Sequence, residues 1–210
     1  MKEMFLNNSI KLINDYSPIS SAEKKEKLLY GLEGIYLTFT KLVVIIILAL
    51  VLNITKEVFL LLLFYNFLRF FGFGFHAETS KECLVISVIL FTIIPFLIKN
   101  NILIINNMFL IWMFCFISFV LFAPADTVKR PMINKKKKLY RKLALLIITS
   151  IYLFSIMYIE NDITMLVSMA LIFQSLMVNP ITYKIFGQPY NNYKNYNGWF
   201  GQLSCLDKMK

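Results

Sequence analysis

The segment of residues 72–83, GFGFHAETSKEC, holds the only histidine of the chain and one of its three cysteines, seven positions apart. A cysteine within hydrogen-bond reach of an imidazole base is the pairing that forms thioesters with substrate acyl groups. In an unbroken helix His76 and Cys83 share a face but stand ~10 Å apart along the axis, beyond that reach. Catalysis by this pair therefore requires a break in the helix between them.

The residues around the pair predict such a break. Gly72 and Gly74 weaken the helix that enters the segment. Residues 79–82, TSKE, fit a capping box that starts a new helix at position 80. Cys83 then lies in the first turn, where the helix dipole favours a thiolate, and His76 lies in a loop that can fold back. The structural alternative makes Cys83 the first apolar residue of a span and His76 an interfacial side chain, and the residues alone do not separate the two.

The remaining reactive residues exclude several classes of enzyme. Cys83, Cys115 and Cys205 are odd in number and form no CxxC pair, so no disulfide scaffold is expected. A single histidine excludes HExxH and three-histidine zinc sites, and GxSxG, Walker A and GxGxxG patterns are absent. Cys115 is expected to be an apolar packing residue. We expect no metal and no cofactor.

The elements that must position the pair are membrane spans. Of 210 residues, 58% are hydrophobic and 16% charged, and the mean hydropathy is +0.65, which does not suit a soluble domain. A helix needs ~20 apolar residues to cross ~30 Å of hydrocarbon. These values predict an all-α polytopic membrane protein with about six transmembrane helices, of which the second and third are short. The six apolar tracts are residues 35–52, 58–71, 84–98, 102–122, 143–159 and 163–179.

The ends of the chain complete this layout. The start lacks the continuous apolar core of a secretory signal, so the amino terminus is expected to stay on the chain. Residues 4–16 space apolar side chains at roughly helical intervals, which predicts an interfacial amphipathic helix on the inner leaflet. We expect a single membrane domain over residues 1–210, with an N-terminal segment 1–34, a transmembrane core 35–183 and a tail 184–210.

The basic residues predict the orientation. Nineteen of the 22 lysines and arginines precede the first tract, follow the second or the fourth, or lie in the tail, and only Lys56 and Lys99 fall opposite. By the positive-inside rule, both termini and the His76–Cys83 link face the cytoplasm of a plasma membrane protein. The net charge of +10 fits this pattern and attraction to anionic lipid better than nucleic-acid binding. An acidic peptide partner drawn to residues 135–138 is left open.

Three blocks of the sequence resemble one family pattern. Residues 30–33 (YGLE) and 123–131 (APADTVKRP) accompany the spacing R-x4-G-x-H-A-x5-C, which is formed by Arg69, Gly74, His76, Ala77 and Cys83. The combination resembles the accessory gene regulator B (AgrB) family, the membrane endopeptidases of Gram-positive quorum sensing. The resemblance covers essentially the whole chain.

The resemblance implies a cysteine endopeptidase that acts on the precursor of an autoinducing peptide. Cys83 corresponds to the nucleophile and His76 to the general base. Arg69 and Gly74 correspond to positions important for activity. Glu33 matches an acidic position and is our candidate for orienting His76 or contacting the precursor, with a surface glutamate near the headgroups as the structural alternative.

The implied reaction is an acyl transfer. The thiolate attacks the carbonyl on the carboxyl side of the signal, the tail of the precursor departs, and an internal Cys or Ser of the precursor releases a thiolactone or lactone ring. The implied precursor has an amphipathic amino-terminal helix and an acidic tail. The predicted docking residues for it are Lys135, Lys136, Lys137 and Lys138.

Other assignments stay open from the sequence. A non-catalytic transporter or exporter of a small peptide, or a membrane adaptor, is the rival, although no broken spans recur in matching halves. Both rivals predict that Cys83→Ser keeps activity. Asp126 departs from a position that is often small and uncharged in the family, so we do not assign it to a catalytic triad. The sequence leaves open the third catalytic residue, the ring type and whether the protein is a homodimer.

Overall fold

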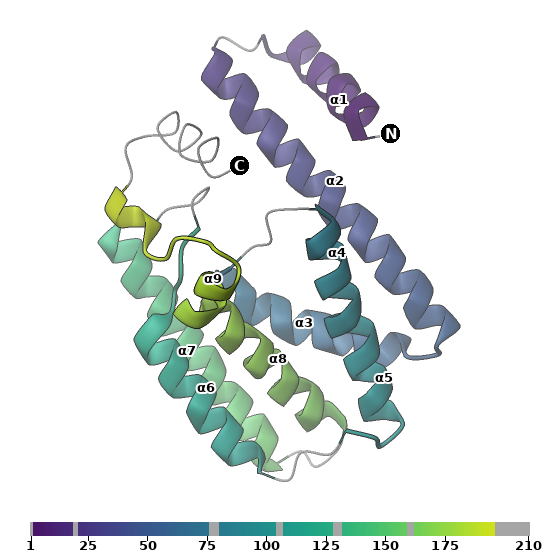
Figure 1. Cartoon of the computed structure of the whole chain (residues 1–210), viewed down its shortest axis with the longest axis vertical. Helices are drawn as coiled ribbons and strands as arrows, with labels where there is room; N and C mark the ends of the chain where they lie inside the picture. Colours follow the sequence, from purple (N-terminus) through teal and green to yellow (C-terminus); the bar gives the residue numbers. More distant parts are fainter. Residues whose placement is uncertain are drawn as a thin grey trace.

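The secondary structure follows the apolar tracts. The computed structural model describes residues 2–18, 21–75, 80–103, 107–127, 132–158 and 162–195, with the backbone alone at positions 23, 80, 81, 194 and 195. Within these residues the chain is helical, and its one extended pairing is an isolated bridge. The elements are α1 (Lys2–Tyr16), α2 (Ala22–Val51), α3 (Thr55–Gly72), α4 (Ser80–Val88), η1 (Ile89–Ile93), α5 (Ile94–Lys99), α6 (Met108–Phe122), α7 (Lys135–Tyr158), α8 (Asp162–Val178), α9 (Pro180–Ile185) and η2 (Asn192–Asn195) (Figure 1).

Three stretches of the described chain are long and apolar enough to cross a membrane. They are Lys24–Val51 in α2, Glu82–Lys99 across α4, η1 and α5, and Lys135–Tyr158, which is α7. The apolar helices α6 and α8 are shorter, at 15 and 17 residues. The all-helical part of the prediction is confirmed, while the count of about six spans and the interfacial place of the N-terminal helix stay predictions.

The core is built around α8. The helices α3, α5, α6 and α7 all pack against it (Figure 1), and 11 of its 17 residues are buried. Small side chains such as Ser168, Ala170 and Ser175 lie among the buried residues of α8, and small residues let helix backbones approach closely in an apolar medium. The carboxyl end of α8 is therefore held in place by packing, and the chain segments that contact it are positioned by it.

The long helix that begins near Cys83 is interrupted by a π-helical turn. Residues 89–93 form η1, and Pro95 stands at the start of α5. Proline lacks an N–H and clashes with the carbonyl four residues earlier, here that of Phe91, and a π turn accommodates that misfit. The Phe91 ring meets Tyr65 of α3 edge-on at 5.2 Å. The interruption thus coincides with the packing of this helix on α3.

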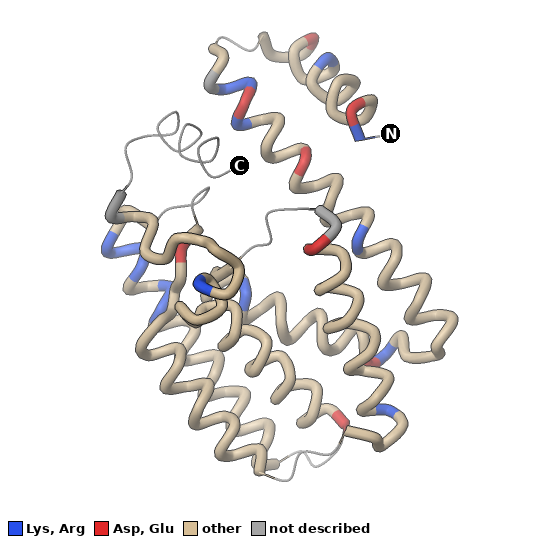
Figure 2. Tube along the Cα trace, in the orientation of Figure 1, with Lys and Arg blue, Asp and Glu red and all other residues tan. Residues whose placement is uncertain are grey.

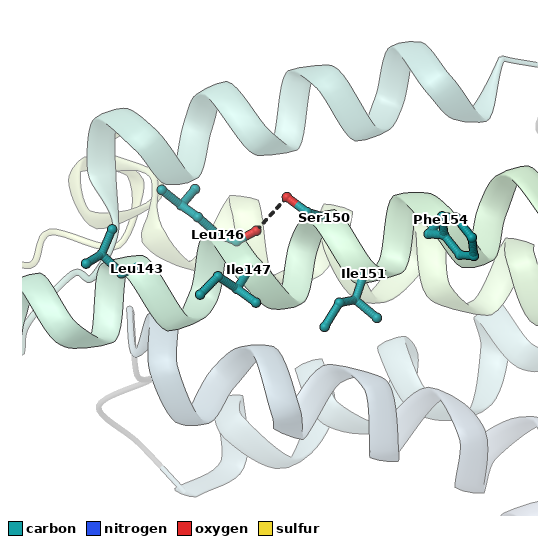
Figure 3. Close-up of a pocket in the computed structure, with 6 residues that line it drawn as sticks. All are labelled: Leu143, Leu146, Ile147, Ser150, Ile151 and Phe154. Carbon is teal, nitrogen blue, oxygen red and sulfur yellow. Dashed lines mark hydrogen bonds between the residues drawn. The ribbon is translucent and has the colours of Figure 1, made fainter.

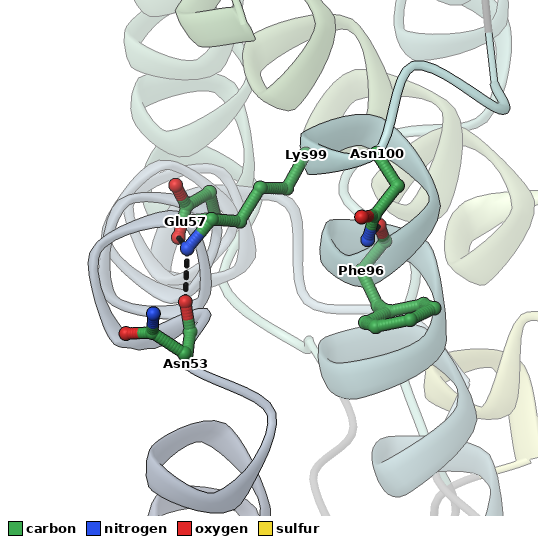
Figure 4. A network of polar contacts seen from close by, with 5 residues as sticks. All are labelled: Asn53, Glu57, Phe96, Lys99 and Asn100. Carbon is green, nitrogen blue, oxygen red and sulfur yellow. Dashed lines mark hydrogen bonds and ion pairs between the residues drawn. The ribbon is translucent and has the colours of Figure 1, made fainter.

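A polar contact joins the turn between α2 and α3 to the end of α5 (Figure 4). The Lys99 ammonium donates to the backbone carbonyl of Asn53 and lies 4.0 Å from the Glu57 carboxylate. Asn53 has a φ of 56°, a left-handed conformation that asparagine adopts more readily than most residues. Lys99, predicted to lie opposite most of the basic residues, thus ties two helix ends together.

The first two helices form a hairpin. The Lys2 ammonium pairs with the Glu33 carboxylate, and the rings of Phe5 and Tyr36 lie 5.4 Å apart. The Ser21 hydroxyl accepts from the amide of Lys24 and caps α2. The predicted amphipathic segment is thus a helix that lies along the first half of α2 (Figure 1).

Charge and apolar surface are distributed unevenly. Lysines and arginines gather at the starts of α2 and α7, and a smaller group lies where the α2–α3 turn meets the end of α5 (Figure 2). The face of α7 carries an open apolar groove (Figure 3). Ser150 supplies the one hydroxyl among its lining residues, and this hydroxyl donates to the Leu146 carbonyl of the same helix. Such a surface matches lipid tails better than water. The lining residues are Leu143, Leu146, Ile147, Ser150, Ile151 and Phe154.

Candidate active site

Cys83 is the fourth residue of α4 and lies in its first turn. The helix begins at Ser80, as the capping pattern predicts, while the predicted N-cap Thr79 lies outside the described residues. The Cys83 side chain is half-buried and its thiol is free. Its carbonyl accepts a hydrogen bond from the Ser87 hydroxyl at 2.7 Å. The sulfur therefore sits on a formed helix turn, at the end where the dipole is positive.

A lysine from another helix contacts this sulfur. Lys41 of α2 donates from Nζ to Cys83 Sγ at 3.1 Å, across 42 positions of sequence. Sequence reasoning assigned no role to Lys41, which lies inside the first predicted apolar tract, residues 35–52. The signal was nevertheless present, because an ionisable side chain inside an apolar span is a functional candidate by default.

His76 lies outside the described residues, but the residue before it is firmly held. The Phe75 amide donates to the carbonyl of Met177 at 2.7 Å. The Phe75 ring is buried and lies 4.5 Å from Phe186 and 6.0 Å from Tyr183, centre to centre. The chain therefore leaves this fixed point one residue before the predicted base.

Arg69 holds the turn that leads to this point. Its guanidinium donates to the backbone carbonyls of Phe73, Gly74 and Phe75. Carbonyls past the end of a helix lack intrahelical donors, and a guanidinium supplies several in a fixed geometry. Gln174 of α8 adds a further donor to the Phe73 carbonyl at 2.8 Å. Arg69 is thus a positioning residue for the segment before His76.

Gly74 is the other fixed point of this turn. Its φ of 110° is rarely adopted by residues with a side chain, and a Cβ there would lie 2.4 Å from the Met177 carbonyl oxygen. The Gly74 amide donates to the Ala125 carbonyl at 2.9 Å, and the Ala125 amide donates to the Gly72 carbonyl at 3.1 Å. Residues 72–75, the GFGF turn, therefore pair with residues 123–126, the APAD segment. The turn also lies against the end of α8.

The APAD segment is in turn fixed by the tail. The Asp126 carboxylate accepts from the backbone amides of Asn192 and Tyr193 at 3.0 and 2.8 Å. The Tyr183 hydroxyl donates to the Asp126 carbonyl at 2.9 Å, and the Tyr190 hydroxyl donates to the Phe122 carbonyl. Burial raises the pKa of Tyr183, and burial with the nearby Asp126 charge raises the pKa of Tyr190 to about 12. Asp126 is a structural anchor in this arrangement.

The chain matches the family described as Accessory gene regulator B over residues 6–178. It belongs to the AgrB family. A protein of Listeria innocua described as AgrB-like is 36% identical over 176 residues, which cover 81% of this chain and 84% of that protein. An AgrB-like protein of Clostridium acetobutylicum is 30% identical over 170 residues, 80% of each chain. A comparison with solved structures finds no match.

Family membership gives the protein a role in accessory gene regulator quorum sensing, where AgrB proteins are linked to peptide processing. With the apolar helices, it also indicates a membrane protein. The matched region runs from α1 to the last residue of α8. It therefore contains Cys83, Lys41, the Arg69 turn and the APAD segment.

Glu33, the acidic family position, lies on α2 with Lys2 as its partner. It precedes Lys41 by eight residues, or ~12 Å along the helix axis. The structure therefore brings Lys41 to the sulfur and places Glu33 more than two helical turns away, against α1. Both of its predicted roles, orienting His76 and contacting the precursor, stay predictions, since His76 lies outside the described residues.

The lysines predicted to dock the precursor form the first turn of α7. Asn134 caps this turn, since its side-chain oxygen accepts from the amides of Lys136 and Lys137 at 3.0 and 3.2 Å. Lys135, Lys136 and Lys137 are exposed, whereas Lys138 lies 4.3 Å from the centre of the Tyr193 ring. Three of the four lysines are therefore available to a partner, and the fourth also holds the tail.

Arg141, one turn further along α7, was missed by sequence reasoning. Its guanidinium donates to the Phe70 carbonyl at 3.2 Å and lies 4.2 Å from the centre of the Phe73 ring. Two arginines, Arg69 of α3 and Arg141 of α7, therefore donate hydrogen bonds to backbone carbonyls at the end of α3 and in the turn after it. Only the fold reveals this, because 72 positions separate Arg69 from Arg141 in the sequence.

Proposed function

We propose that the protein is a membrane cysteine endopeptidase that cleaves the precursor of an autoinducing peptide and closes the released peptide into a ring. The observation that carries the proposal is the position of Cys83 in the first turn of α4 in a chain of the AgrB family. A helix amino terminus favours the thiolate, which is the nucleophilic form of cysteine.

In the first half of the proposed reaction, the Cys83 thiolate attacks the carbonyl carbon on the carboxyl side of the signal sequence. An S–C bond forms while the carbonyl electron pair moves to oxygen. When the intermediate collapses, the C–N bond breaks, and the amine of the tail leaves with a proton from His76, which had accepted the thiol proton. The products are a thioester on Cys83 and the free tail.

In the second half, a Cys or Ser side chain within the acyl peptide attacks the thioester. Cys83 leaves as the thiolate, and the peptide leaves as a thiolactone or lactone. Exchange of a thioester for a thiolactone conserves the acyl energy, so no ATP is required. The sulfur is half-buried, which limits the access of water and favours ring closure over hydrolysis.

Arg69 and Gly74 have a positioning role in this proposal. They fix the backbone of residues 73–75 against α8 and the APAD segment. His76 is the next residue, so the turn limits where its imidazole can lie relative to α4. This role accounts for the family pattern in which the arginine and glycine precede the histidine.

We further propose a multi-pass chain in the plasma membrane, with the site and both termini on the cytoplasmic side. The basic starts of α2 and α7 support this orientation through the positive-inside rule (Figure 2). The same surface suits anionic lipid and a precursor with an acidic tail.

The proposal is tested with the full chain in vesicles and a candidate precursor with an amphipathic helix and an acidic tail. We expect the intact chain to release the tail and to carry a peptide adduct on Cys83, detected by mass spectrometry. Cys83→Ala and His76→Ala should abolish both signals while the protein remains inserted. Cleavage by Cys83→Ala would reject Cys83 as the nucleophile, and no cleavage by the intact chain would reject the peptidase and favour a transporter or an adaptor.

A further inference from the structure

Lys41 is unusual for its position in the chain. It lies within the candidate span Lys24–Val51, among exposed apolar neighbours such as Phe39, Leu42 and Val43. It is ten residues before the end of α2, or ~15 Å along the helix axis. A cation within an apolar span is costly and is expected to have a partner.

The partner of Lys41 is the sulfur of Cys83. Lys41 is half-buried, and its ammonium donates to Sγ at 3.1 Å. A neutral thiol is a weak acceptor, whereas a thiolate attracts the ammonium by charge as well as by hydrogen bonding. The contact therefore gains most when the sulfur is ionised.

We propose that Lys41 is a further catalytic residue, whose ammonium pairs with the Cys83 thiolate and keeps the nucleophile charged until it attacks. This inference rests on the proposed peptidase function. Lys41 keeps its proton throughout: the thiol proton goes to His76, the sulfur electron pair forms the S–C bond, and the ammonium is then free to face the negative oxygen of the intermediate.

Among the residues whose side chains the structure describes, the other titratable groups near this pair are engaged elsewhere or exposed. On α2, which packs on α4, Glu33 pairs with Lys2 and the ring of Tyr36 lies against Phe5. The remaining charged or titratable residues of α2 precede Lys41 by 11 positions or more. On α4 the side chain of Glu82 is exposed, and η1, ILFTI, carries none.

A structural role for Lys41 is the alternative to be separated. A contact that only holds α2 against α4 would matter for stability and would leave the reactivity of the sulfur unchanged. The two roles are distinguished by measuring thiol reactivity directly, without a peptide substrate.

The test uses the full chain in vesicles and follows alkylation of Cys83 by iodoacetamide across pH, with the Cys83 peptide quantified by mass spectrometry. In Lys41→Met the alkylation of Cys83 near neutral pH should be slower than in the unmodified protein, because the thiolate loses the ammonium that contacts it. Lys41→Arg should stay near the unmodified protein, and Lys41→Gln, a donor without charge, should behave like Lys41→Met. Lys56→Met, which removes an exposed lysine elsewhere, is the matched control.

Superimposable profiles for Lys41→Met, Lys41→Gln and the unmodified chain would overturn the inference. If Lys41→Met fails to insert, Lys41→Gln against Lys41→Arg decides the same question. Failure of the peptidase proposal gives a different result: the intact chain does not cleave the precursor, while the alkylation of Cys83 still depends on Lys41. With the precursor, cleavage near neutral pH should fall about tenfold or more in Lys41→Gln, because the nucleophile loses its charged partner.

Discussion

At the residue scale, Gly74 explains why a glycine precedes the histidine in the family pattern. The position combines a positive φ with close approach to a carbonyl of α8. Neither feature is visible in the sequence, where Gly72 and Gly74 indicate only a weak helix. Gly72 has its own reason, since a Cβ there would meet the Gln174 amide nitrogen at 2.4 Å. Each glycine thus admits a different contact of α8.

We predict that Gly74→Ala destabilises the protein by about 1–3 kcal/mol, because the residue must keep a strained backbone or move away from Met177. Precursor cleavage should fall about tenfold or more, because the turn that leads to His76 shifts. Thermal unfolding in detergent and cleavage in vesicles measure the two effects. Gly34→Ala is the control, because nothing lies within 4 Å of a Cβ there. Equal behaviour of the two variants would contradict a positioning role for the turn.

At the element scale, the candidate site depends on helix ends. The end of α3, the start of α4 and the end of α8 all contribute, with the APAD segment between α6 and α7 paired to the turn. Helix ends carry unpaired backbone groups, so the arginines, Gln174 and Asp126 satisfy these groups or those of the adjacent turns. Polar residues that look like catalytic candidates in the sequence are therefore partly explained as caps.

Asp126 gives a direct test of that explanation. Asp126→Ala should free the amides of Asn192 and Tyr193 and increase proteolysis of the tail, while the chemical step at Cys83 changes little. Limited proteolysis and single-turnover cleavage in vesicles measure the two. A triad acid would instead cost about 10⁴-fold in the chemical step. Such a loss with an intact tail would make Asp126 a catalytic residue instead of a structural anchor.

At the scale of the whole molecule, charge is segregated along the fold. The starts of α2 and α7 carry nine of the 18 described basic residues. Lys56 and Lys99 lie near the turn between α2 and α3 and the end of α5 (Figures 2 and 4). The antiparallel run of the helices brings together lysines that are distant in sequence. The lysines at the start of α7 can therefore be replaced as a group to measure their contribution to binding of the precursor.

We predict that replacing Lys135, Lys136 and Lys137 together with Gln raises the KM for a precursor with an acidic tail by about tenfold at low salt. The effect should shrink as salt is raised, because the Debye length is ~10 Å at 0.1 M. Lys138 is kept, since it also lies over the Tyr193 ring. Initial rates in vesicles give KM and kcat separately, with Lys56→Gln as control. An unchanged KM would remove these lysines from substrate docking.

The sequence by itself determined the helical membrane class and the start of the helix at Ser80. Both are set by local chemistry: apolar tracts must satisfy their backbone groups as helices, and capping residues act within one turn. It also carried the family pattern that joins Arg69, Gly74 and Cys83, because the spacing between those residues is short.

Only the tertiary structure decided what contacts the sulfur. Lys41 and Cys83 are 42 positions apart, and Arg141 and the end of α3 are 71 apart. Such contacts depend on how helices cross, which is set by side-chain packing over whole helix faces and leaves no periodic mark in the sequence. The packing of whole helix faces also places Glu33 in contact with α1 and away from the sulfur.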